Sequence, residues 1–141
     1  MSIPLLAMAC HSAPATIAVK DRHGVIRADV TRVDGVKDGP VRFFDEDGSL
    51  RTAGSYHNDY RHGIWITVDE RGDTLSLLRF KAGRKDGTQG YWAPNGRLLR
   101  VEQFDNGIPD GPLCRFFSDG TPRQLTWYAQ GVPDGTYAEW Y

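Results

Sequence analysis

The stretch DGVKDGPVRFFDEDG (Asp34–Gly48) returns with few changes as DNGIPDGPLCRFFSDG (Asp105–Gly120). The shared glycines belong to three columns that recur every 24 residues and contain all but two of the 16 glycines in the chain. The columns are Gly39, Gly63, Gly87, Gly111 and Gly135; Gly24, Gly48, Gly72, Gly96 and Gly120; and Gly35, Gly83, Gly107 and Gly131, with Asp59 in place of one glycine. A fixed period of this length is the signature of a repeat protein.

Each unit reads as two short strands that alternate with two turns. Asn-Gly and Asp-Gly between apolar runs favour type I′ hairpin turns. We therefore expect such turns inside the units, at Asp47-Gly48, Arg71-Gly72, Asn95-Gly96 and Asp119-Gly120. The turn that links two units is expected to span Gly35–Gly39 and its equivalents, where the Asp bonds nearby backbone amides. The first two glycine columns are thus predicted to consist of turn residues.

Alternation along the first strand of each unit separates two faces. One face carries small or apolar residues, and we expect it to be the buried one: Arg42, Ile66, Gly90, Cys114 and Ala138, then Phe44, Val68, Trp92, Phe116 and Trp140. The opposite face is mixed in character: Val41, Trp65, Gln89, Leu113 and Tyr137, then Phe43, Thr67, Tyr91, Arg115 and Glu139.

The predicted fold is all-β, an elongated antiparallel sheet of tandem 24-residue hairpins in a single twisted or curled layer. No helical stripe competes, because glycine interrupts the chain about every dozen residues. We expect an N-terminal tail over residues 1–14 and a repeat array over 15–141. The array divides into a degenerate unit (15–34), clear units (35–58, 59–82, 83–106 and 107–130) and a partial unit (131–141).

Two segments, RHGIWITVDERGDTL (Arg61–Leu75) and NGRLLRVEQFDNGIPDG (Asn95–Gly111), carry a family pattern most clearly. At these columns the sequence resembles the MORN-repeat-variant family of bacteria, over roughly residues 34–141. The resemblance implies a hairpin-repeat sheet without an active site. Members of that family are often antitoxin-like proteins paired with secreted toxins, and some carry lipoprotein signals. Related eukaryotic MORN repeats are associated with membrane tethering and scaffolding.

The sequence offers no catalytic, cofactor or metal constellation. No histidine has Cys, Asp or Glu partners at a convincing ligand spacing, and the Asp-Gly pairs lack the final Glu of an EF-hand loop. No Gly-rich loop precedes a helix, as phosphate-binding loops require. The net charge of -1 gives no general attraction to nucleic acid. We therefore predict a protein that is not an enzyme and binds no cofactor, metal or nucleic acid.

Two groups of residues are candidates for binding a partner. On the mixed face, Trp65, Tyr91 and Arg115, with Trp127 near one end, are residue types that dominate protein interfaces. The alternative is that this face packs against a second layer formed by curling of the sheet. A basic cluster, Arg79, Lys81, Arg84 and Lys85, fits either contact with anionic lipid headgroups or an acidic partner, or an ordinary solvated turn.

The N-terminal sequence MSIPLLAMAC resembles the end of a bacterial lipoprotein signal, whose cysteine, here Cys10, is lipidated after cleavage. Against this, no Lys or Arg precedes Cys10, and Ala7 stands where leucine is usual. A start codon assigned too late accounts for the missing basic region, and the alternative is a tail of no consequence. A signal predicts the bacterial cell envelope, and a plain tail the cytoplasm. Cys114, in a predicted strand, is expected to be a small buried residue and not a disulfide partner.

These features lead to one main hypothesis and two alternatives about function. The main hypothesis is a non-catalytic module for protein–protein interaction or scaffolding, associated with the envelope if Cys10 is lipidated. One alternative is an antitoxin or immunity protein that neutralises a toxin partner. The other is a module that binds anionic membranes through the basic cluster.

Overall fold

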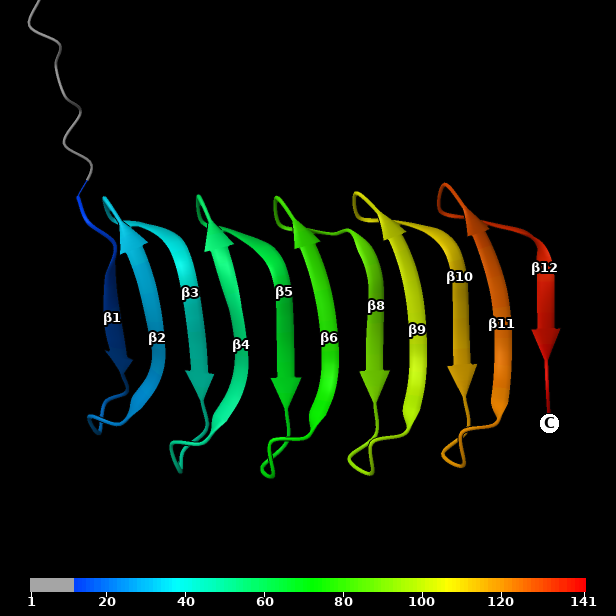
Figure 1. The fold of residues 1–141 in the computed structure, drawn as a ribbon, viewed down its shortest axis with the longest axis horizontal. Helices are drawn as coiled ribbons and strands as arrows, with labels where there is room; N and C mark the ends of the chain where they lie inside the picture. The colour runs from blue at the N-terminus through cyan, green and yellow to red at the C-terminus, as the bar shows by residue number, and fades with distance from the viewer. Residues whose placement is uncertain (1–11) are drawn as a thin grey trace, which may run out of the picture.

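The computed structural model describes residues 12–141, which form one open antiparallel sheet (Figure 1). The strands are β1 (Ala15–Lys20), β2 (Ile26–Val33), β3 (Val36–Phe44), β4 (Leu50–His57), β5 (Tyr60–Val68), β6 (Thr74–Lys81), β7 (Arg84–Lys85), β8 (Gly87–Trp92), β9 (Leu98–Asp105), β10 (Ile108–Phe116), β11 (Pro122–Ala129) and β12 (Val132–Glu139). Consecutive strands pair throughout, except that β6 pairs with both β8 and the two-residue β7. The predicted all-β sheet of hairpins is confirmed. Cys10, the predicted lipidation site, lies outside the described residues.

Two kinds of turn lie at opposite ends of the strands (Figure 1). We call these ends the upper and lower edges of the sheet, as drawn there. On the upper edge, two-residue turns have positive φ at both positions, as in type I′ turns; Asp34 and Gly35 have φ of 51° and 81°. On the lower edge, in loops such as 45–49, only the glycine has positive φ. The prediction of type I′ turns at Asp47-Gly48 and its equivalents is therefore wrong. Arg71 is tolerated before Gly72 because it does not adopt positive φ.

The column that begins with Gly39 lies at β-bulges within strands or, for Gly87, at the start of β8 after the break from β7. The prediction that this column forms turns is wrong. Between β9 and β10, Phe104 pairs with Pro109 and Glu102 with Leu113, so β10 contributes extra residues at this place. Within this bulge Gly111 has φ of 120°, and a Cβ there would lie 2.8 Å from the side chain of Gln103. Glycine is needed because the bulged backbone has positive φ and a neighbouring side chain covers it.

Hydrogen bonds along the upper edge join each unit to the next. The amide of Gly83 donates to the carbonyl of Arg61 at 2.9 Å, and equivalent bonds recur in the following two units. The aspartate before the bulge glycine adds a second link, since Asp86 Oδ1 accepts from the amide of Asn106 at 3.0 Å. Each hairpin is thus positioned by its neighbour, as in other repeat arrays.

The two faces of the sheet are covered unequally. We name the aromatic face the one that carries Val41, Trp65, Gln89 and Leu113, and the aliphatic face the one that carries Ile66, Leu77, Val101 and Leu125. The most buried side chains lie on the aromatic face, where Val41, Trp65 and Gln89 are 1%, 3% and 0% exposed.

The prediction that the other face is the buried one is therefore wrong. On the aliphatic face Arg42 is exposed, and Ile66 and Leu77 are only half-buried. No second layer covers that face among the described residues (Figure 1). The aromatic face is covered because long side chains on it lie across their neighbours.

Trp65 and Gln89 occupy the same column of the repeat, and the side chain of each donates a hydrogen bond to a backbone carbonyl of the preceding strand. Trp65 Nε1 donates to the carbonyl of Ser55 at 3.1 Å, and Gln89 Nε2 donates to the carbonyl of Arg79 at 3.2 Å. Gln89 Oε1 also accepts from the amide of Arg79 at 2.9 Å. A buried polar group needs such partners. Here the Gln89 side-chain amide bonds the backbone N–H and C=O of Arg79 as a neighbouring strand would.

The two glycines outside the columns, Gly54 and Gly90, each lie beneath a tryptophan. A Cβ on Gly54 would lie 2.3 Å from the indole of Trp65, and a Cβ on Gly90 would lie 2.4 Å from the indole of Trp92. Neither glycine has positive φ. Their role is therefore to give room for an aromatic ring laid against the strand.

We expect the cost of Gly54→Ala to depend on Trp65. In the wild type the new methyl group overlaps the indole, which costs about 1–3 kcal/mol. In a Trp65→Leu background, Leu being the residue at the equivalent position 113, the same change becomes neutral or stabilises by about 0.4–1 kcal/mol, since alanine restricts the unfolded chain. Urea unfolding of the four variants measures this change of sign. Equal effects of Gly54→Ala in both backgrounds would contradict it.

The lower-edge loops are closed by an aspartate that accepts hydrogen bonds two residues ahead. Asp47 Oδ1 accepts from the hydroxyl and the amide of Ser49 at 2.6 and 2.9 Å, and Asp119 is bonded in the same way to Thr121. These hydrogen bonds, from the hydroxyl first and then from the amide, lower the pKa of Asp47 and of Asp119. At the equivalent place Asn95 keeps the bond to the backbone amide without a charge.

Because folding lowers these pKa values, the aspartates contribute stability above their unfolded pKa of about 3.9, and that contribution is lost as the pH falls through the folded values. We expect the double variant Asp47→Asn/Asp119→Asn to melt below the wild type at pH 7. The difference should shrink towards pH 2. Melting followed by circular dichroism across this range measures it, and a difference that stays constant with pH would refute the assignment.

Candidate binding surfaces

The residues predicted to contact a partner are not all brought together. Tyr91 and Arg115 lie on the aromatic face with Trp65, but Trp127 pairs with Pro112 on the aliphatic face. Trp65 is 3% exposed and packs edge-on against Tyr56 with ring centroids 5.2 Å apart, so its surface is already used inside the chain. Trp127 is 45% exposed. The predicted group therefore divides into a packing residue, the half-buried Tyr91, and two exposed residues on opposite faces, Arg115 and Trp127.

The predicted basic cluster divides in a similar way. Arg79, Lys81 and Arg84 are exposed on the aliphatic face, where Ile64 pairs with Arg79 and Lys81 with Arg84. Lys85 lies on the aromatic face. Its ammonium donates to the Tyr91 hydroxyl at 3.2 Å, so Lys85 makes its contact within the sheet.

Basic side chains alternate with rings along the aromatic face. Lys37 lies 4.3 Å from the ring centre of Tyr56, and Arg61 lies 4.6 Å from that of Trp65. Such contacts between cations and aromatic rings are attractive and bury the aliphatic stems of the basic residues. They explain how a face with no second layer holds the most buried side chains of the sheet.

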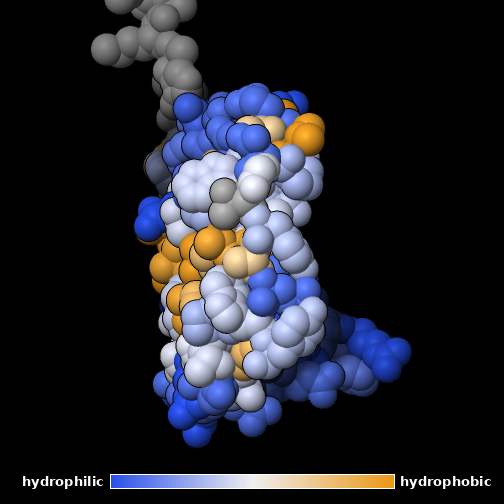
Figure 2. Space-filling model, turned by 90° about the vertical axis from the view of Figure 1, so that its right-hand side faces the viewer, coloured by the Kyte–Doolittle hydropathy of each residue, from blue (hydrophilic) through white to orange (hydrophobic). Residues whose placement is uncertain are grey.

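The aliphatic face presents two adjacent rows without a charged side chain. One row runs from β4 to β12 through direct cross-strand partners: Ala53, Ile66, Leu77, Gly90, Val101, Cys114, Leu125 and Ala138. The second row lies towards the lower edge: Phe44, Leu50, Val68, Thr74, Trp92, Leu98, Phe116 and Pro122. We call the two rows together the apolar band. Figure 2, which views the sheet from its β12 end, shows hydrophobic residues gathered at mid-height on one side.

Most of the apolar band is half-exposed. Ile66, Leu77, Val101, Cys114 and Leu125 are intermediate in exposure, and Leu50 is 38% exposed. The predicted burial of Cys114 is thus only partial, and its thiol is free. Soluble proteins seldom leave a continuous apolar surface of this extent without a partner. The band is therefore a candidate interface.

A second candidate surface lies on the aromatic face, around Tyr91 and Arg115. With Leu99, Arg100, Phe116 and Arg123 these residues line an open hollow of about 340 Å³. Sequence reasoning missed Arg100 and Arg123. The available signal was the repeat itself, because the residues one and two units before Arg100 in its column are Ser76 and Thr52.

Among residues 12–141, no helix has the length and hydrophobicity to span a membrane, and no three His, Cys, Asp or Glu side chains of the described part are grouped to hold a metal ion. No known family matches the chain, and no characterised protein is similar in sequence. The resemblance to MORN-repeat-variant proteins therefore stays a prediction.

Proposed function

We propose that this protein is a non-catalytic binding module that takes a partner protein on its apolar band. The observation that carries the proposal is the continuity of the band. Direct cross-strand partners from β4 to β12 place eight uncharged residues in one row, beside a second uncharged row. Burial of apolar surface drives most protein association, and a face this long favours an extended contact.

The margin of the band indicates the chemistry of the partner. Arg79, Lys81 and Arg84 are exposed beside the band, and none of them forms an ion pair with a described residue. A partner with acidic residues along one side of an apolar strip would neutralise them and be oriented by them. At about 4.8 Å per strand the row is about 34 Å long. An amphipathic helix of about 22 residues matches that length.

Substitutions on the two faces separate this function from a general loss of structure. We expect Leu77→Gln/Val101→Gln to weaken binding at least tenfold, since both side chains lie in the centre of the band and are half-exposed. The matched control is Thr67→Gln/Ser76→Gln, a cross-strand pair of the aromatic face that is also half-buried. A protein retained by the immobilised wild type is purified and titrated against all three by calorimetry.

The proposal holds if the purified partner binds the wild type and the control equally and the band variant at least tenfold more weakly. It fails if both variants bind alike. It also fails if light scattering shows that the wild type self-associates through the band, because a second copy would then be the occupant. Replacing Arg79 and Lys81 by Ser should weaken binding more at low salt than at high salt, because salt screens these exposed charges. The antitoxin and membrane-binding hypotheses stay predictions.

A further inference from the structure

One row of the aromatic face changes character at β9 and β10. In an earlier unit Thr52 pairs with Thr67, and their hydroxyl oxygens lie 3.4 Å apart. At the equivalent place two units later, Arg100 pairs with Arg115. Directly opposed side chains have Cβ atoms about 5 Å apart, and like charges there are destabilising. Since the fold accepts a neutral pair at this place, it does not require two opposed arginines here.

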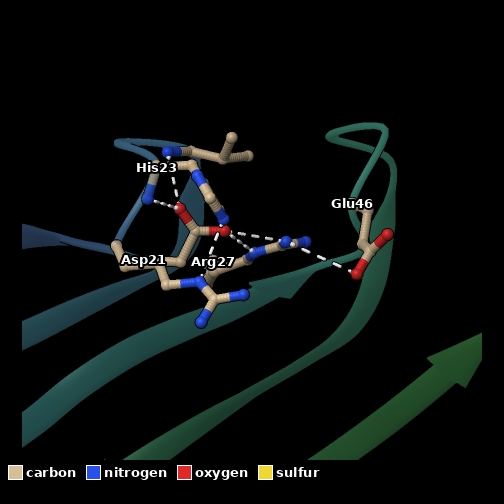
Figure 3. A network of polar contacts seen from close by, with 6 residues as sticks. Asp21, His23, Arg27 and Glu46 are labelled. Atoms are coloured by element: carbon tan, nitrogen blue, oxygen red, sulfur yellow. Dashed lines mark hydrogen bonds and ion pairs between the residues drawn. The ribbon is translucent and has the colours of Figure 1, made fainter.

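A third arginine, Arg123, lines the same hollow and has no carboxylate paired with it among the described residues. In the first loop Asp21 Oδ2 accepts from Arg27 Nε at 2.8 Å, and Arg27 also approaches Glu46 at 3.7 Å (Figure 3). Arg123 occupies the same column as Arg27, but the residue equivalent to Asp21 is Phe117. The guanidinium of Arg123 lies 5.6 Å from the Phe117 ring centre and forms no ion pair among the described residues.

The neighbours of these arginines leave their donors available. Arg100 pairs with Glu102 through Nε at 3.2 Å, which leaves its Nη groups for a ligand. Its guanidinium lies 4.1 Å from the ring centre of Tyr91 and is held by that contact. Lys85 donates to the Tyr91 hydroxyl, so the hydroxyl proton is free to be donated in turn. Arg115 is exposed and forms no ion pair with any residue of 12–141.

We propose that Arg100, Arg115 and Arg123, with the hydroxyl of Tyr91, form a binding site for a phosphate monoester. Three guanidinium groups and a phenol offer more donors than the two oxygens of a carboxylate accept, whereas three phosphate oxygens match them. Lys85 adds a fourth positive charge beside Tyr91, and Glu102 pairs with both Lys85 and Arg100. The positive charge that remains suits a dianion. Tyr91, Arg100 and Arg115 lie on the face opposite the apolar band, although Phe116 of the band borders the hollow. The proposal does not depend on the function proposed for that band.

The test replaces the arginine pair by the pair that the repeat uses elsewhere. Arg100→Thr/Arg115→Thr recreates the Thr52 and Thr67 pair, and Lys20→Thr/Arg22→Thr removes the same charge at the far end of the sheet. Inorganic phosphate and acetate are titrated at pH 8 and constant ionic strength, with the arginine side chains observed by NMR. We expect the wild type and the control to bind phosphate in the millimolar range and acetate at least tenfold more weakly. The arginine variant should lose phosphate binding at least tenfold while its melting temperature is unchanged or higher by up to about 4 °C.

A second variant removes no arginine. Phe117→Asp gives Arg123 the carboxylate that Arg27 has, and we expect it to weaken phosphate binding several-fold. Flotation with phosphatidylcholine vesicles, with and without phosphatidic acid, identifies the source of the phosphate. Flotation that depends on the arginine pair assigns a lipid headgroup, and its absence beside saturable phosphate binding assigns a soluble ligand. The proposal is overturned if the wild type binds neither probe, if acetate binds as tightly as phosphate, or if the arginine variant keeps the wild-type affinity.

Discussion

Each unit after the first contains one short stretch of strand with positive φ, and the architecture depends on it. At Gly111 the backbone bulges under the side chain of Gln103, and the register on one side of β10 shifts relative to the other. The bulge brings the preceding aspartate to the next turn, where Asp110 accepts from the amide of Gln130 at 3.2 Å. A single backbone feature thus sets the strand geometry and joins the units. This is why glycine recurs at a constant interval although glycine weakens ordinary strands.

A single layer has no shared interior, so its stability must come from contacts between neighbours. The aromatic face supplies them with rings and basic side chains that cover one another, as Arg61 covers Trp65. The aliphatic face has no equivalent, and its side chains stay half-exposed. Because only neighbour contacts stabilise a single layer, the aromatic face is packed and the aliphatic face keeps surface available for a partner.

The repeat also acts as an internal reference for each position. A residue that departs from its column needs a local explanation, and several departures have one. Gly54 makes room for an indole, and Gln89 completes backbone hydrogen bonds. Arg100 packs against Tyr91 and pairs with Glu102, but no ion pair accounts for Arg115 opposite it, which is why the pair supports a binding site. Phe117, in the place of an aspartate, removes the charge that would neutralise Arg123.

The sequence by itself determined the fold class, the period and the antiparallel hairpins, because glycine spacing and strand alternation are local properties of the chain. It did not distinguish bulges from turns, since an Asp-Gly pair fits both and only pairing with the neighbouring strand decides between them. Nor did it identify the covered face, because coverage depends on how Lys37, Arg61 and Lys85 lie across rings from other strands. The tertiary structure alone showed that Trp127 lies apart from Tyr91 and Arg115. It also showed that Arg100 and Arg123 lie beside Tyr91 and Arg115. Such groupings depend on register and on bulges that redirect side chains, and neither can be counted along the sequence.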